Sequence, residues 1–134
     1  MREAIAGPGD ARIRRVEIAG REPARVSVHG AGGQAAAYFT HVVTRPPLAG
    51  RRTLMADLLG SGLSDRPADL GYRLEDHADA LTIPRTLLVG ALSQPPAGTA
   101  ELEAVGVRGV TVPDAGHNIV LDNPQAFAEH VASV

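Results

Sequence analysis

The stretch that decides the fold reads MADLLGSGLSDRP over residues 55–67. It begins inside an apolar, β-prone run from Thr53 to Leu58, which predicts a strand. Gly60 to Asp69 is then rich in Gly, Ser, Asp and Pro, and this composition predicts a loop directly after the strand. Asp57 stands where strand gives way to loop, so we expect its carboxylate at a strand end.

On the N-terminal side of this stretch, a strand leads into a helix through a run of glycines. Ala24–Val28 predicts a short strand, HGAGG follows it, and the Ala-rich segment Gln34–Val43 predicts a helix that ends before Pro46. The alternating segment Arg12–Ile18 predicts an earlier strand. Because only a short turn separates it from Ala24–Val28, we expect these two strands to form an antiparallel pair.

The C-terminal half continues the alternation of strands and helices. We expect helices at Leu74–Leu81, Thr99–Val105 and Pro124–Val134, and strands at Thr86–Gly90 and Arg108–Val112. Such alternation predicts a three-layer α/β fold with a mostly parallel sheet of about five or six strands and an antiparallel N-terminal strand pair. At this length, residues 1–134 are expected to form a single domain, in which residues 1–11 are flexible.

The glycine-rich turn is open to more than one interpretation. Gly30, Gly32 and Ala35 satisfy the pattern G-x-G-x-x-[GA] between a strand and a helix. In a nucleotide-binding module, such a turn presents backbone N–H groups at a helix N-terminus to a pyrophosphate. Asp57, at the end of the next strand, would then serve as the acid that binds the ribose.

The alternative interpretation is an oxyanion-binding loop. His29 stands directly before the glycines, and H-G-x-G is typical of loops whose backbone N–H groups stabilise a developing negative charge. A tight strand-to-helix turn also needs glycine whatever its function, so the turn alone does not decide between these alternatives. The residues that would bind an oxyanion or substrate are His29, Gly30, Ala31, Gly32 and Gly33.

Composition excludes several classes of chemistry. The chain has no cysteine, which excludes disulfides, thiolate nucleophiles and Cys-ligated zinc. It has no lysine either, which excludes Schiff-base chemistry and a P-loop lysine. The five histidines form no H-x-H or H-x-x-x-H pair, so we predict no metal site, and we expect no cofactor.

Charge and hydropathy bear on partners and location. The net charge of -2 and the absence of Trp give no reason to expect nucleic acid or an acidic membrane surface as a partner. No apolar run approaches the roughly 18 residues of a membrane span. The first ten residues lack the apolar run of a signal peptide, so we expect a cytoplasmic protein.

Four stretches, taken in order, resemble the α/β-hydrolase family. VHGAGG at 28–33 resembles its oxyanion turn, and 55–67 is similar to its strand–loop segment D-x-x-G-x-G-x-S-x-x-P. IPRTLLVG at 83–90 resembles the strand that carries the acid of the catalytic triad, and VPDAGHN at 112–118 resembles the loop that carries the triad histidine. The resemblance covers nearly all of residues 12–134 and implies a hydrolase fold and a small acyl substrate.

The sequence departs from the family's pattern in its middle. Family members are normally much longer, and a helix resembling Leu74–Leu81 leads in them to the nucleophile elbow, G-x-S-x-G. Here Leu81 runs directly into Thr82, and no serine of the chain has a glycine both two residues before it and two residues after it. The nucleophile elbow and the lid therefore have no counterpart between Leu81 and Thr82.

By resemblance, His117 occupies the position of the catalytic histidine, where a general base is expected. The usual acid position, just after Thr86–Gly90, holds no carboxylate. Ser93 lies there instead, and it would either form a weak Ser–His dyad with His117 or hydrogen-bond the imidazole. Asp57 is the first candidate for a substitute acid, and Asp65 and Asp76 are others.

Three functional hypotheses follow. The first is an enzyme of hydrolase ancestry acting on an ester-, lactone- or similar acyl ligand, with His117 as base. The second is a catalytically silent domain that binds a small molecule or assembles with copies of itself. In both, either Thr86–Gly90 closes up against Ala24–Val28 in place of the missing middle strands, or a sheet edge is left open. An open apolar edge invites pairing with a second chain, so we expect a homo-oligomer. The third is the nucleotide-binding module that uses Gly30, Gly32 and Ala35.

Overall fold

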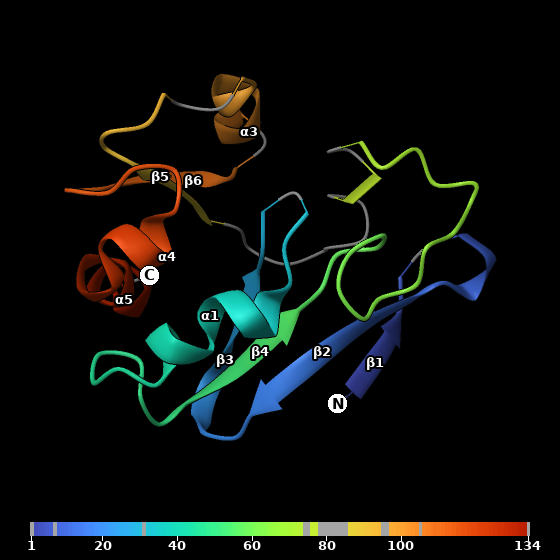
Figure 1. The fold of residues 1–134 in the computed structure, drawn as a ribbon, viewed down its shortest axis with the longest axis horizontal. Coiled ribbons are helices and arrows are strands. Elements are labelled where there is room, and N and C mark those ends of the chain that lie inside the picture. Colours follow the sequence, from blue (N-terminus) through green and yellow to red (C-terminus); the bar gives the residue numbers. More distant parts are fainter. Residues whose placement is uncertain are drawn as a thin grey trace. The chain divides into compact units, whose positions relative to one another are not determined.

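The computed structural model describes residues 2–6, 8–30, 32–73, 76–77, 86–94, 97–104 and 106–133. The chain divides into two compact units, each with its own sheet (Figure 1). The first comprises Met1–Thr44 and Ala49–Thr82, and the second comprises Arg45–Leu48 and Ile83–Val134.

The first unit is a four-stranded mixed sheet with the strand order β1-β2-β4-β3. β1 pairs with β2 and β2 with β4 in antiparallel fashion, whereas β3 and β4 are parallel, with Val28 opposite Ala56. Its elements are β1 (Arg2–Ile5), the 3-10 turn η1 (Pro8–Asp10), β2 (Arg12–Ile18), β3 (Arg21–Val28), α1 (Ala35–Val43) and β4 (Arg51–Ala56).

The expected antiparallel relation between β2 and β3 is present, but the two strands do not pair directly. β4 lies between them, antiparallel to β2 and parallel to β3. The chain leaves β3, passes through α1 and returns in β4, which pairs with β3 in parallel. The short turn between β2 and β3 predicts a direct β2–β3 hairpin, but β4 lies between the two strands. Gly20 permits the close approach of this turn, since a Cβ there would lie 2.4 Å from the Arg51 carbonyl carbon.

α1 forms where the sequence predicts a helix, within one residue at its start. Its buried side chains, Ala35, Phe39, Val42 and Val43, repeat at the spacing of one helical face, and the helix contacts β4, β2 and β3. Elsewhere in the first unit, Ile13 of β2 is buried in a small apolar cluster with Ala11, Ala56 and Leu59. The cluster includes Ala56, the last residue of β4, so this packing holds the end of β4, where the next loop begins.

The second unit is built on a parallel pair of strands. β5 (Thr86–Gly90) pairs with β6 (Arg108–Val112) from Thr86–Arg108 to Gly90–Val112, and α3 (Thr99–Ala104) lies between them in sequence. α4 (Ile119–Asp122) and α5 (Pro124–Ala132) follow β6.

The ends of the C-terminal helices follow local sequence rules. Asn123 caps α5 by accepting a hydrogen bond from the Ala126 N–H at 3.1 Å, and Pro124 occupies the first turn, as the sequence predicts. α4 is a single turn that the sequence pattern does not indicate. The expected helix Leu74–Leu81 lies outside the described residues, apart from the helical pair Asp76 and His77.

Candidate functional site

Asp57 joins the first unit's helix to its long loop. Its side chain is buried, with 4% of the residue exposed, and Oδ1 accepts a hydrogen bond from the Ala35 N–H at 2.7 Å. Oδ2 accepts a second bond from the Leu63 N–H at 2.9 Å. Ala35 is the first residue of α1, where backbone N–H groups have no partner within the helix and the helix dipole favours a negative charge.

Two glycines let the loop close around this carboxylate. Gly62 has φ +49°, and a Cβ there would lie 2.1 Å from Asp57 Oδ2. Gly60 has φ +83°, and a Cβ there would lie 2.3 Å from Cε1 of the Tyr72 ring, whose hydroxyl donates to the Pro67 carbonyl at 2.8 Å. Both positions therefore need glycine for backbone conformation and for space.

Ser64 and Asp65 attach the same loop to β2. The buried Ser64 hydroxyl donates to the Asp57 carbonyl at 2.6 Å and accepts from the Arg14 N–H at 2.8 Å. Asp65 accepts from the Arg12 N–H at 3.0 Å and pairs with the Arg14 guanidinium. The hydrogen bond from Arg14 lowers the pKa of the Asp65 carboxyl below its ordinary value. The motif from Asp57 to Pro67 thus specifies a loop that is stabilised by hydrogen bonds among its own residues and to β2.

His29 is buried beneath the glycine-rich turn, with 4% of its surface exposed. Its Nδ1 lies 2.6 Å from the Gly30 carbonyl oxygen, and its Nε2 accepts from the Leu58 N–H at 3.1 Å. A ring that donates through Nδ1 and accepts through Nε2 is held in its Nδ1–H tautomer. His29 therefore connects the end of β3 to the end of β4.

The turn itself is shaped by these contacts. The Gly33 N–H donates to the Gly30 carbonyl at 3.1 Å, and a Cβ on Gly33 would lie 3.0 Å from His29 Cβ. Gly32 has φ +73° and open space around its Cα. Ala31 lies outside the described residues. His29, one of the predicted oxyanion residues, is buried, and its hydrogen bonds stabilise the turn. Oxyanion binding by the turn stays a prediction.

The same geometry disfavours the nucleotide alternative. That interpretation needs a free N–H at the start of α1 and a free acidic side chain at the end of β4. The Ala35 N–H is already bound by Asp57, and both oxygens of Asp57 already accept backbone hydrogen bonds. A pyrophosphate or a ribose hydroxyl would have to break these bonds in a buried site.

In the second unit, the turns after β5 and β6 are joined to each other. The Ala91 N–H donates to the Val112 carbonyl and the Leu92 N–H donates to the Ala115 carbonyl, both at 2.9 Å. Gly90 packs so tightly that a Cβ would lie 2.2 Å from the Gly116 carbonyl oxygen. These contacts place the residues after β5 beside the loop that carries His117.

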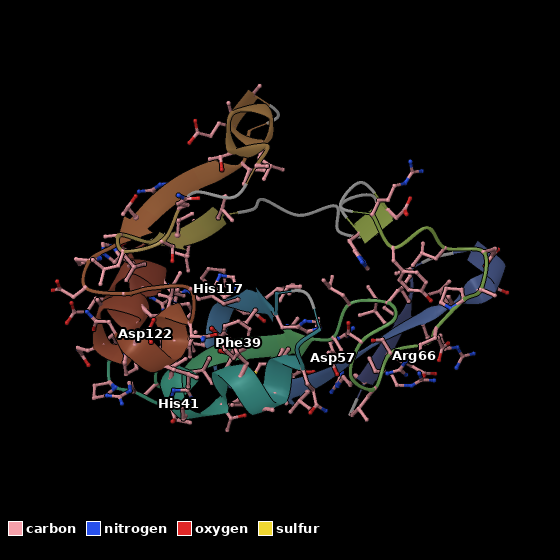
Figure 2. All side chains as sticks on the ribbon, turned by 45° about the horizontal axis from the view of Figure 1, so that its top comes forward. Phe39, His41, Asp57, Arg66, His117 and Asp122 are labelled. Atoms are coloured by element: carbon pink, nitrogen blue, oxygen red, sulfur yellow. The ribbon has the colours of Figure 1, made fainter. Side chains whose placement is uncertain are left out.

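The side chains of Asp122 and Asn123, at the C-terminal end of α4, hold the His117 loop by hydrogen bonds. Asp122 Oδ2 accepts from the Gly116 N–H at 2.9 Å, and Asn123 Nδ2 donates to the Pro113 carbonyl at 3.1 Å. The labelled side chains of His117 and Asp122 belong to this C-terminal part of the chain (Figure 2). The sequence motifs do not single out Asp122; the available signal is an acid five residues after the histidine and just before the helix cap.

Ser93 and His117 lie on these adjoining turns without bonding each other. The Ser93 N–H donates to the Gly90 carbonyl at 2.9 Å and the residue is half-buried, whereas His117 is exposed. Within the described parts of the chain, no hydrogen bond or ion pair joins the Ser93 side chain or any carboxylate to the His117 imidazole. Their catalytic roles therefore stay predictions.

The described residues also bear on metal binding and on membrane insertion. Among them, no group of three or more His, Asp or Glu side chains is arranged to hold a metal ion. None of their helices has the length and hydropathy needed to cross a membrane.

We predict that Asp57→Asn lowers the free energy of unfolding by about 2–3 kcal/mol, because an amide offers one acceptor oxygen and leaves a buried N–H without a partner. Urea denaturation followed by circular dichroism measures the difference. Asp69→Asn, at an exposed position near the end of the same loop, serves as the control and should change stability by less than about 0.5 kcal/mol. Equal effects of the two substitutions would contradict the role assigned to Asp57.

A second prediction concerns pH. Because the pKa of Asp65 is lowered in the folded state, its pair with Arg14 stabilises the fold above the ordinary carboxyl pKa of about 4. That contribution is lost as the pH falls through the lowered pKa. The stability difference between the wild type and Asp65→Asn should therefore be present at about pH 6 and shrink towards about pH 2–3, as measured by thermal unfolding. A difference that is independent of pH would refute this assignment.

Comparisons with known proteins place this geometry in a fold family. No protein-family profile matches the chain. The 2-hydroxymuconate semialdehyde hydrolase of Pseudomonas sp. (strain CF600) is 41% identical over 71 residues, covering 47% of this chain and 25% of the relative. The chain thus spans about a quarter of the length of this curated relative.

Solved structures extend the likeness over most of the chain. A point mutant of the meta-cleavage product hydrolase CumD matches 82% of this chain and 43% of its own, with a TM-score of 0.53 and 21% identity. A predicted CIB-like hydrolase from Thermoplasma acidophilum matches 98% of this chain and 96% of its own, with a TM-score of 0.60 and 12% identity. Both likenesses concern the fold. The chain therefore has an α/β-hydrolase fold in partial form, with mixed parallel and antiparallel strands.

Proposed function

We propose that this chain is a hydrolase-like protein that binds a small ester- or lactone-like ligand, with His117 in the catalytic position. The observation that carries the proposal is the construction of the His117 loop. It stands at the carboxyl end of a parallel strand, the edge at which open α/β sheets bind ligands. Hydrogen bonds at Pro113, Ala115 and Gly116 fix its backbone and leave the imidazole exposed.

We propose further that its hydrolase activity is weak, non-standard or absent, since the sequence contains no G-x-S-x-G elbow. Without that serine, His117 would act on water directly. The imidazole takes a proton from water as the oxygen attacks the carbonyl carbon, and returns it to the leaving alcohol when the ester bond breaks. By the resemblance, N–H donors for the oxyanion are expected from the turn Gly30–Gly33, in which the Gly33 N–H already donates to the Gly30 carbonyl. In a variant of this mechanism, Ser93 acts as a weak nucleophile in place of water.

The relatives extend the substrates to be screened. The curated relative is named for 2-hydroxymuconate semialdehyde, and CumD for meta-cleavage products. A screen should therefore contain short-chain nitrophenyl esters, a lactone and 2-hydroxymuconate semialdehyde. We further propose that residues 1–134 act as one α/β-hydrolase-like domain and that the protein is cytoplasmic.

The second candidate function is a non-catalytic domain that assembles with copies of itself. It is favoured by the position of β3, which has β4 on one side and no other described strand on the other. Pro23 blunts the start of this edge because it has no N–H to donate, whereas the rest of the strand alternates Val26 and Val28 with Arg25 and Ser27. A homo-oligomer formed through β3 would complete the hydrogen bonds of that edge.

The enzyme hypothesis predicts slow ester hydrolysis that depends on His117. His117→Ala should lower the rate by about 100-fold or more, because a general base contributes roughly that factor. His41→Ala, on the exposed face of α1, is the matched control and should keep the wild-type rate. Labelling by a serine phosphonate, lost in Ser93→Ala, would identify Ser93 as nucleophile. Hydrolysis that survives His117→Ala would refute the assignment, and an inactive wild type would favour the binding domain.

The oligomer hypothesis predicts a particle mass of at least twice 13.9 kDa in light scattering at micromolar concentration. Val26→Lys places a charge on the partly exposed face of β3 and should shift the mass towards that of the monomer. Arg21→Lys, at the blunted start of the strand, keeps its charge and should leave the mass unchanged. A monomeric wild type would exclude assembly through this edge.

A further inference from the structure

We infer that Asp122 is a positioning residue for His117, and that its carboxylate holds the imidazole in the Nδ1–H tautomer. The inference rests on the proposed function, because it assigns the acid that this site otherwise lacks. The position just after β5 holds Ala91, Leu92, Ser93 and Gln94, none of which carries a charge.

Asp122 is anchored on the main chain of the loop that carries His117. Its Oδ2 accepts from the N–H of Gly116, the residue directly before His117. A Cβ on Gly116 would lie 3.1 Å from the same oxygen, so the glycine lets the carboxylate approach the main chain of the loop. No described residue hydrogen-bonds Oδ1, and Asp122 is exposed, so this oxygen is free to take a second partner.

The His117 loop does not need a charged side chain to hold its main chain in place. Its other two anchors are neutral, namely the Leu92 N–H bonded to Ala115 and the Asn123 amide bonded to Pro113. An amide oxygen would serve the Gly116 N–H equally well. A carboxylate at this place adds a negative charge to the loop that carries His117, and a carboxylate is the group that orients the imidazole in general-base sites.

The geometry also selects the ring nitrogen. Nδ1 is the nitrogen nearer to the main chain, and the carboxylate is fixed on the main chain of the preceding residue. His117 and Asp122 are not ion-paired in the structure, and the proposed contact requires the exposed imidazole to rotate about its side-chain torsions, which exposed residues do within nanoseconds. Donation from Nδ1 leaves the Nε2 lone pair free to accept a proton from water.

The test is ¹⁵N NMR of the imidazole at alkaline pH, where the ring is neutral and its two tautomers have different nitrogen shifts. The His117 signal is assigned by its loss in His117→Ala. We expect mainly Nδ1–H in the wild type, although a neutral imidazole in water favours Nε2–H. Asp122→Asn keeps an acceptor for Gly116 but removes the charge, and should reduce the Nδ1–H share by about twofold or more. Asp122→Glu should restore part of it.

Asp114→Asn is the matched control, because it removes the same charge from the same loop without touching the Gly116 anchor. It should leave the tautomer ratio unchanged. An Nε2–H wild type, an unchanged ratio in Asp122→Asn, or equal changes in the two variants would overturn the inference. Loss of folding in Asp122→Asn would also overturn it, by showing that the charge serves the fold. The readout needs no turnover, so an inactive protein refutes the proposed activity and leaves this result standing.

Discussion

The first unit depends on one carboxylate that is shared between a helix and a loop. Asp57 is buried at the end of β4, and each of its oxygens accepts one backbone N–H, from Ala35 and from Leu63. A single side chain therefore satisfies the exposed donor at the start of α1 and closes the loop that follows β4. The glycine at position 62 is required by this arrangement, because any side chain there would collide with the carboxylate.

The glycine-rich turn depends on the same neighbourhood. His29 donates to the Gly30 carbonyl and accepts from the Leu58 N–H, so it ties the turn after β3 to the residue that follows Asp57. His29 Nε2 and Asp57 Oδ1 lie 3.9 Å apart, and the two buried side chains hold adjoining strand ends in place. The features that resemble a catalytic or phosphate-binding motif in sequence thus serve first to organise backbone, and any ligand would meet the N–H groups that they leave exposed.

In the second unit, hydrogen bonds again hold a loop in place, here without a buried carboxylate such as Asp57. The loop that carries His117 is fixed by backbone contacts to the turn after β5 and by the side chains of Asp122 and Asn123. These bonds constrain the main chain just before His117 and leave its imidazole exposed. An exposed ring on an anchored loop suits the proposed role of His117 as a general base, and Asp122 is the carboxylate proposed to orient that ring.

The sequence by itself determined the local elements and the order of the family's motifs. Strand and helix periodicity located α1, β5 and β6 almost to the residue, because buried faces repeat with the period of each element. Only the tertiary structure decided which strand lies between β2 and β3, and which partners occupy Asp57 and Asp122. Strand order and hydrogen-bond partners are set by packing between residues far apart in the chain, and a local pattern of residue types does not contain that information.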